Sequence, residues 1–192
     1  MKKLFESLDG FINRGVYPNK LSWLLDFPLR RLIISPQNLA DRLHLKNNFH
    51  VLEIGPGPGY FSIEVAKRLS KGKLELIDIQ SNMLDIIRKK DIKNILKNIK
   101  YKTGDIAKAE YNDEMFDVIF MITVLGEVEN QQACLKNIFR ALKPKGILSV
   151  TEQPGDPDFI TFSKLKELLK NHGFKFVKKY DSLFNYTANF SK

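Results

Sequence analysis

The chain has 192 residues, 43 % of them hydrophobic, which suits one globular domain with a substantial core. Its single cysteine, Cys134, excludes an intramolecular disulfide and makes the cytoplasm the expected compartment. The most apolar early stretch, residues 21–34, is interrupted by charges and a proline, so no membrane span is expected. No signal peptide is expected either, because charged residues come before any apolar core forms at the start of the chain.

The net charge of +9 raises the question of nucleic acid binding. Much of it is concentrated in residues 88–108, which hold eight basic and two acidic residues. In a parallel sheet, a helix after the second strand runs back toward the amino ends of the strands, away from the edge that binds ligands. A solvated basic face is therefore the preferred interpretation, and an RNA-binding track is the alternative.

Residues 1–47 precede the first expected strand and form an N-terminal helical extension in this interpretation. Ser35 and Pro36 predict a helix start, with serine as N-cap and proline at the first helical position. Upstream, residues 17–32 form a dense apolar cluster without clear periodicity, in which Tyr17 is the most notable polar tip. The extension is either a lid or substrate wall with Tyr17 as a candidate catalytic residue, or a helix that only shields one sheet face.

A glycine-rich turn follows the first strand, which is expected over Val51–Ile54. Gly55, Gly57 and Gly59 let the backbone turn sharply and let a ligand approach the main chain. A helix with regularly spaced apolar residues is expected to begin near Phe61. The turn is thus predicted to be a cofactor loop at the carboxyl end of a strand.

The loop does not suit a dinucleotide. In the G-x-G-x-x-G fingerprint the third glycine would stand where this chain has Tyr60. Pro56 and Pro58 have no N–H to offer a pyrophosphate, and Glu53 places a carboxylate just before the turn. A cationic ligand without phosphate, such as S-adenosylmethionine, fits better than NAD.

Asp78 stands at the carboxyl end of the second expected strand, Lys73–Ile79. An acidic side chain there can accept hydrogen bonds from ribose hydroxyls. Capping of the next helix by Asp78 is the weaker alternative, because Ser81 or Asn82 can serve as the cap.

The other expected elements continue an alternation of strands and helices. Phe184–Phe190 alternates apolar and polar residues and is expected to be a half-buried strand, paired antiparallel with its close predecessor. The further elements are a helix over Asn82–Ile95, a strand over Ile99–Thr103, a strand over Phe116–Ile122, a helix over Asn130–Leu142, a turn over Lys143–Gly146, a strand over Ile147–Thr151, a helix over Phe159–Asn171 and a strand over Phe174–Tyr180.

Three segments resemble the class I S-adenosylmethionine-dependent methyltransferases, in particular the small methyltransferases related to the ubiquinone/menaquinone C-methyltransferases. They are residues 53–59, the run Gly104-Asp105-Ile106, and the block from Phe116-Asp117 to Lys143-Pro144-Lys145-Gly146. The resemblance covers about residues 48–192. It implies a Rossmann-like, doubly wound α/β fold whose seven-stranded sheet is mostly parallel and ends in an antiparallel C-terminal hairpin.

The resemblance also implies that Asp105 contacts the adenine amino group and that Ile106 packs on the ring. The side chains expected to hold S-adenosylmethionine, and its product S-adenosylhomocysteine, are Glu53, Gly55, Pro56, Gly57, Gly59, Asp78, Ile79, Met83, Asp105, Ile106 and Met121.

The acceptor is expected to be a small molecule, and methyl transfer needs a base only if the attacking atom must lose a proton. Carboxylates follow the fourth and fifth strands, and Glu127 is the first candidate for a substrate contact because it follows the fourth strand closely. His44 near the extension is a second candidate base or a surface residue. The scattered histidines and lone cysteine predict no metal site. The other carboxylates on this side are Glu129, Glu152 and Asp156.

Three other functions stay open. An RNA-directed methyltransferase is one, although the Asn/Asp-Pro-Pro-Tyr motif of nucleic-acid amino-methyltransferases is replaced here by residues 121–126, Met-Ile-Thr-Val-Leu-Gly. A non-catalytic protein that binds S-adenosylmethionine is the second, and an NAD-dependent enzyme is the third. The oligomeric state does not follow from the sequence.

Overall fold

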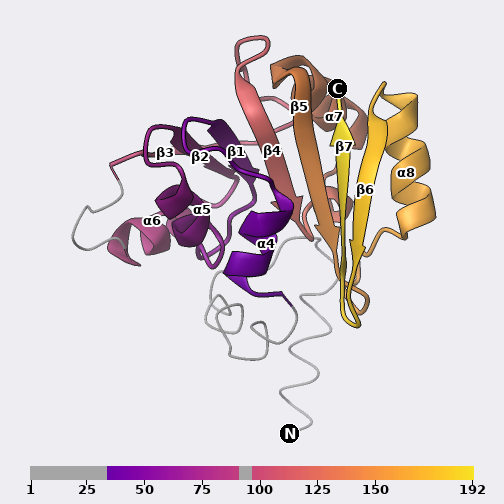
Figure 1. Cartoon of the computed structure of the whole chain (residues 1–192), viewed down its shortest axis with the longest axis horizontal. Helices are drawn as coiled ribbons and strands as arrows, with labels where there is room; N and C mark the ends of the chain where they lie inside the picture. The colour runs from indigo at the N-terminus through magenta and orange to yellow at the C-terminus, as the bar shows by residue number, and fades with distance from the viewer. Residues whose placement is uncertain (1–33, 91–96) are drawn as a thin grey trace, which may run out of the picture.

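A computed structural model describes residues 34–90 and 97–192. Tyr17 and the rest of the predicted lid up to residue 33 lie outside the described residues, as do residues 91–96 at the predicted end of a helix. Figure 1 shows one twisted sheet with helices packed against it. The elements are α4 (Pro36–Arg42), β1 (His50–Ile54), α5 (Ser62–Arg68), β2 (Lys73–Asp78), α6 (Ser81–Lys90), β3 (Ile99–Thr103), β4 (Phe116–Ile122), the 3-10 turn η2 (Leu125–Glu127), α7 (Gln131–Ala141), β5 (Leu142–Glu152), α8 (Phe162–Asn171), β6 (Lys175–Asp181) and β7 (Tyr186–Ser191).

The sheet has seven strands in the order β3-β2-β1-β4-β5-β7-β6. The first five strands of the chain pair in parallel, whereas β7 pairs antiparallel with both β5 and β6. This confirms the predicted fold class, including the antiparallel C-terminal hairpin. The order reverses between β1 and β4, and ligands of open α/β sheets bind outside the carboxyl ends of the strands at such a point.

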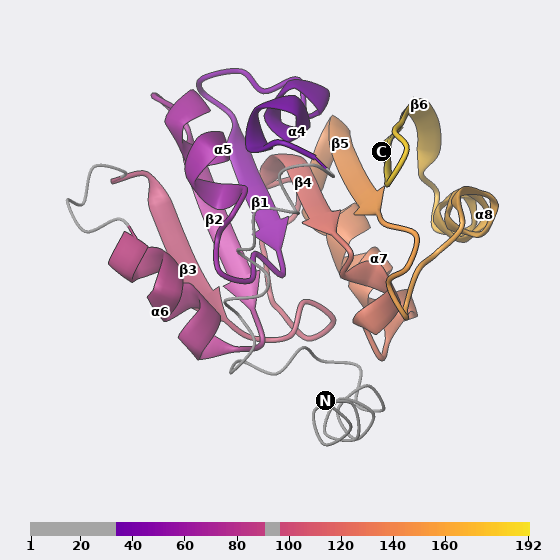
Figure 2. The same ribbon diagram turned by 90° about the horizontal axis from the view of Figure 1, so that it is seen from below.

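Two apolar clusters cover the two faces of the sheet, as a doubly wound fold requires. One joins β1 and β2 to α4, α5 and α6 through side chains such as Leu39, Val65 and Leu84. The other packs α7 and α8 against β4, β5 and β7 through side chains such as Leu135 and Leu165. Figure 2, the view from below, shows α4 and α5 apart from α7 and α8, with the strands between them.

The predicted turn over Lys143–Gly146 is wrong in one respect, because β5 already begins at Leu142. Phe116 pairs with Leu142, but Val118 pairs with Ile147, so β5 carries extra residues at this place. Lys145 has φ 63°, so the residues predicted to form the turn form a bulge within β5.

β7 is not the half-buried strand that its alternation predicts. Its polar side chains are as buried as its apolar ones, with Thr187 0 % and Asn189 1 % exposed. Asn189 donates to the carbonyl oxygen of Arg42 at 2.8 Å, so α4 covers the face that the pattern assigns to water. Phe184, expected at the start of the strand, is instead exposed before β7 begins.

Within residues 34–90 and 97–192, no helix is long and apolar enough to cross a membrane.

Candidate cofactor and acceptor site

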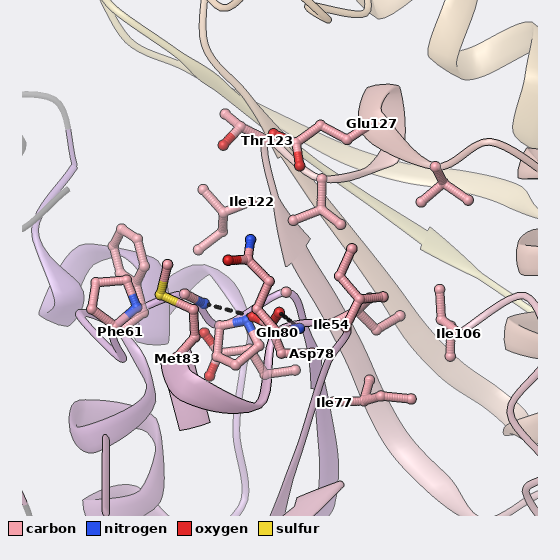
Figure 3. Close-up of a pocket in the computed structure, with 18 of the residues that line it drawn as sticks. Ile54, Phe61, Ile77, Asp78, Gln80, Met83, Ile106, Ile122, Thr123 and Glu127 are labelled. Carbon is pink, nitrogen blue, oxygen red and sulfur yellow. Dashed lines mark hydrogen bonds between the residues drawn. The ribbon is translucent and has the colours of Figure 1, made fainter. Parts of the chain in front are cut away.

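A cavity of about 660 Å³ lies at the carboxyl ends of β1, β2 and β4. In Figure 3, Phe61 and Met83 lie on one side of it and Ile106 on the other, with Asp78 and Gln80 between them and Glu127 beyond. Its volume is in the range of small-molecule and cofactor sites. The lining residues are Glu53, Ile54, Gly55, Pro56, Gly57, Pro58, Tyr60, Phe61, Ile77, Asp78, Ile79, Gln80, Met83, Gly104, Asp105, Ile106, Ile122, Thr123, Val124, Glu127, Val128, Glu129, Gln153, Gly155, Asp156 and Pro157.

The glycine loop forms one wall of the cavity. Gly55, Gly57 and Gly59 all have positive φ, at 64°, 53° and 80°, a region that other residues enter only at a steric cost. An added Cβ would lie 2.5 Å from Val124 at Gly55 and 2.6 Å from Ile87 at Gly59, but at Gly57 it would meet nothing within 4 Å. Gly55 and Gly59 therefore serve packing within the protein, whereas Gly57 leaves open space toward the cavity.

Asp78 closes the end of β2 and is 8 % exposed. Its Oδ1 accepts from the Gln80 N–H at 2.8 Å and its Oδ2 accepts from the Gly57 N–H at 3.3 Å. The carboxylate thus ties the glycine loop to the second strand and keeps lone pairs for a ligand, since each carboxylate oxygen can accept two hydrogen bonds. Burial raises its pKa, and the two backbone donors oppose that shift.

Glu53 is the most unusual group of the site. It is 2 % exposed near the end of β1, and its Oε2 has no hydrogen-bond partner among residues 34–90 and 97–192. Burial raises the pKa of Glu53 to about 8, the Ser62 side chain opposes this shift, and the charge of Asp78 adds to it. A buried carboxyl oxygen without a donor is costly, so its presence on the cavity wall favours a cationic ligand.

Asp105 and Ile106 lie on the loop after β3 and line the same cavity. Asp105 Oδ1 accepts from the Ala107 N–H at 2.8 Å, which fixes the loop as an Asx turn. The structure thus brings the predicted Gly-Asp-Ile run next to the glycine loop and Asp78, although these segments are far apart in the sequence.

The predicted acceptor side is formed by η2 and by the loop after β5. Glu127, Glu129 and Asp156 line the cavity there. The two segments pack closely, because a Cβ at Gly126 would collide with the carbonyl oxygen of Asp158. His44, the other candidate base, is not among the residues that line the cavity; its ring instead makes a 2.6 Å hydrogen bond with Tyr180 Oη.

Glu152 lies at the end of β5 but does not line the cavity. It is 1 % exposed, its Oε2 accepts from the Ile160 N–H at 3.3 Å, and its Oε1 has no hydrogen-bond partner in the described part of the chain. Burial raises the pKa of Glu152 to about 8, and the charges of Asp156, Glu127 and Asp158 act in the same direction.

Two of the predicted cofactor residues do not line the cavity. Met121 belongs to the core cluster under α7, and its neighbour Ile122 lines the cavity instead, since successive strand residues face opposite ways. Gly59 donates its N–H to the carbonyl oxygen of Pro56 at 3.0 Å and packs against Ile87 of α6. The sequence reasoning did not predict Tyr60 or Thr123 as site residues. Both adjoin an expected strand end or loop, which is the signal that could have identified them.

Six of the cavity-lining side chains are carboxylates, and no lysine, arginine or histidine of the described part of the chain lines it. Within the same part, no group of three or more acidic, histidine or cysteine side chains could hold a metal ion. A doubly wound sheet with this acidic, glycine-rich edge defines a class of protein that binds a cationic nucleoside cofactor. The buried Glu53 oxygen and the open space at Gly57 fit S-adenosylmethionine, which carries a sulfonium and an ammonium.

Comparison with known proteins agrees with this class. A family described as "Methyltransferase domain" matches residues 45–185. The demethylmenaquinone methyltransferase of Lactobacillus johnsonii is 28 % identical over 175 residues, with 71 % of this chain and 72 % of the relative covered. A ubiquinone/menaquinone biosynthesis C-methyltransferase of Neisseria meningitidis is 34 % identical over 110 residues, covering 57 % of this chain and 44 % of its own length.

Among solved structures, a SAM-dependent methyltransferase from Aquifex aeolicus superimposes with a TM-score of 0.84 at 22 % identity, covering 92 % of this chain and 99 % of that one. The [4+2]-cyclase SpnF has the same fold, with a TM-score of 0.75 at 18 % identity over 82 % of this chain and 79 % of that one. The chain belongs to the methyltransferase-domain family, as a SAM-dependent methyltransferase with S-adenosylmethionine as its cofactor.

Proposed function

We propose that this protein transfers the methyl group of S-adenosylmethionine to a small-molecule acceptor that binds between η2, the loop after β5 and the glycine loop. The observation that carries the proposal is the single continuous cavity, which joins the cofactor residues of β1 and β2 to the carboxylates after β4 and β5. A protein that only bound the cofactor would not need the part of the cavity that the carboxylates after β4 and β5 line. An extended nucleic acid is disfavoured because the lining carboxylates would repel phosphates.

In this proposal, Glu53 faces the cationic part of the cofactor, Asp78 accepts from its ribose hydroxyls, and Asp105 with Ile106 holds its adenine. The bound cofactor supplies the activated methyl group. The protein then contributes orientation and exclusion of water, and orientation can supply about 7–11 kcal/mol of a barrier. Glu127 is the proposed contact to the acceptor, and it would accept a proton only if the attacking atom must lose one.

The relatives suggest which acceptor to test first. They are named as demethylmenaquinone and ubiquinone/menaquinone C-methyltransferases, so a reduced quinone ring is the first candidate. A neutral ring is compatible with an acidic cavity, whereas an anionic acceptor is not.

Calorimetric titration with S-adenosylmethionine, S-adenosylhomocysteine and NADH tests the cofactor assignment. We expect the first two to bind, NADH not to bind, and Asp78→Ala to weaken both by about tenfold or more through loss of charged hydrogen bonds. Asp158→Ala, outside the cavity lining, is the control. Mass spectrometry of reaction mixtures with reduced quinones then detects transfer. Binding of NADH in place of the first two ligands would contradict the assignment.

Cofactor binding without transfer to any small molecule would instead support the rival function of a non-catalytic protein. The fold alone does not exclude this rival, since a cyclase shares the fold.

A further inference from the structure

A small recess adjoins the large cavity beneath the ends of β4, β5 and β7. It has a volume of about 10 Å³, enough for about one water-sized group. The recess is a side pocket of the site, because both spaces are lined by Phe61, Ile122, Thr123 and Gln153. The other described residues that line the recess are Ile34, Thr151 and Asn185.

The wall of the recess continues into a buried chain of polar groups. Thr151 is 2 % exposed, and its Oγ lies 2.8 Å from Oγ of Thr187, which is 0 % exposed. Arg42 Nη1 donates to Thr187 Oγ at 2.8 Å and to Asn185 Oδ1 at 3.2 Å. The hydroxyls of the two threonines therefore connect a guanidinium on α4 to the wall of the recess.

Arg42 forms no ion pair with any carboxylate in the described part of the chain, and burial lowers its pKa. An arginine stays protonated at working pH, so its charge acts on the hydroxyls in front of it. Because a guanidinium can only donate, Thr187 Oγ accepts from Arg42. Thr187 can then donate its own proton to Thr151, which leaves the Thr151 proton available to a group in the recess.

Thr123 stands at the junction of the recess and the cavity with φ 52°. This conformation is a genuine outlier for a β-branched residue, and such strain persists where the surroundings impose it, often at functional sites. The Thr123 N–H donates to the carbonyl oxygen of Thr151 at 2.8 Å and holds the residue in place. The chain thus maintains an unfavourable backbone at the point where a ligand would enter the recess.

We propose that this recess binds one oxygen atom of the methyl acceptor, and that Thr151, backed by Thr187 and Arg42, donates the hydrogen bond that selects it. The inference rests on the proposed function and deepens it, because it requires an acceptor that carries a hydroxyl or carbonyl oxygen. The recess admits a single group, and an unmatched buried donor penalises an acceptor that lacks this oxygen. Arg42 and Thr187 are positioning residues, and Thr151 is the residue that touches the acceptor.

The test compares two ring compounds that differ by one oxygen, 1-naphthol and naphthalene. Their binding to the full chain is measured by ligand fluorescence, with and without S-adenosylhomocysteine, so no turnover is needed. We expect 1-naphthol to bind about tenfold or more tightly than naphthalene. In Thr151→Val, which keeps the side-chain shape, this ratio falls to near one while the affinity for S-adenosylhomocysteine is unchanged.

Thr187→Val provides a second variant, and we expect it to reduce the same ratio by a smaller factor. The matched control is Ser149→Ala, because Ser149 is buried on the same strand as Thr151 but does not line the recess, and its hydroxyl has no hydrogen-bond partner among the residues that the structure describes. Equal affinity of the two compounds in the unchanged protein would overturn the inference, as would absence of 1-naphthol binding or an equal loss in Ser149→Ala. Failure of methyl transfer, with the ratio retained, would contradict only the proposed function.

Discussion

Replacing Glu53 by glutamine is expected to make the empty protein more stable and the cofactor affinity weaker. Glu53 is buried on the cavity wall, with one oxygen that no described residue contacts by a hydrogen bond and a pKa raised from 4.5 to about 8. A glutamine has nearly the same shape and no charge to desolvate. The residue is thus kept as an acid at the expense of stability, which is expected of a group that serves a ligand.

The size of the effect follows from the difference between the folded and unfolded pKa of Glu53. Because the pKa is higher in the folded protein, the carboxyl stabilises the fold most below pH 4.5, and this contribution is lost as the pH rises through 8. Because pH 7 lies 2.5 pH units above the ordinary pKa of 4.5, the free energy of unfolding is lower there by about 3 kcal/mol at most. Glu53→Gln avoids this loss, so its thermal midpoint at pH 7 is expected to rise by up to about 6–12 °C.

Differential scanning calorimetry between pH 4.5 and pH 9 measures this effect. We expect the two proteins to differ little at the acidic end and increasingly as the pH rises. Calorimetric titration with S-adenosylmethionine is expected to show about tenfold to hundredfold weaker binding to the variant, through loss of a charged partner. Wild-type binding below pH 8 should release a proton, and binding to the variant should not. Glu167→Gln, on the exposed side of α8, is the control for the change of net charge.

A variant that is less stable than the wild type at pH 7, or one that binds S-adenosylmethionine unchanged, would refute this account of Glu53.

Three further outcomes are expected. Gly57→Ala should lose about 1–2 kcal/mol of stability, because φ is 53°, and at least tenfold in cofactor affinity in calorimetry, since Gly57 lines the cavity and its methyl group would occupy open space there. Gly59→Ala should lose more stability than Gly57→Ala in urea unfolding, because its Cβ would press on Ile87, and the reverse order would contradict the assigned roles. Cys134 is buried and its pKa is raised to about 12, so a thiol reagent should modify it only in denaturant; rapid modification of the folded protein would contradict this burial.

Local patterns in the sequence, together with the resemblance to the class I methyltransferases, were sufficient for the fold class and for most of the residues that line the predicted cofactor side of the cavity. The glycine loop, Asp78 and the Gly104-Asp105-Ile106 run each follow an expected strand, and parallel strands bring their carboxyl ends to one edge. Residues that are far apart in the chain could therefore be assigned to one site before any distance was known. The chemical argument against a dinucleotide likewise needed only residue types in and beside the loop, namely Pro56, Pro58, Glu53 and Tyr60.

Other features depend on contacts between distant segments and could not be read from a local pattern. The polar face of β7 alternates as a solvated face would, yet it is buried because Arg42, more than 140 positions away, bonds to Asn185 and Thr187. Met121 and Ile122 are both apolar neighbours in β4, and the sequence does not show which of them faces the cavity. The register of the sheet decides this.

Sequence alone therefore determined the order of the elements, the kind of cofactor and the edge of the sheet where the cavity lies, since these depend on residue type and short-range spacing. Tertiary structure alone decided that one Glu53 oxygen has no hydrogen-bond partner among the described residues, that Gly57 and not Gly59 faces open space, and that a half-buried arginine stands behind Thr151. Burial and hydrogen-bond partners belong to the packed chain, because each depends on which distant side chains exclude water from a group.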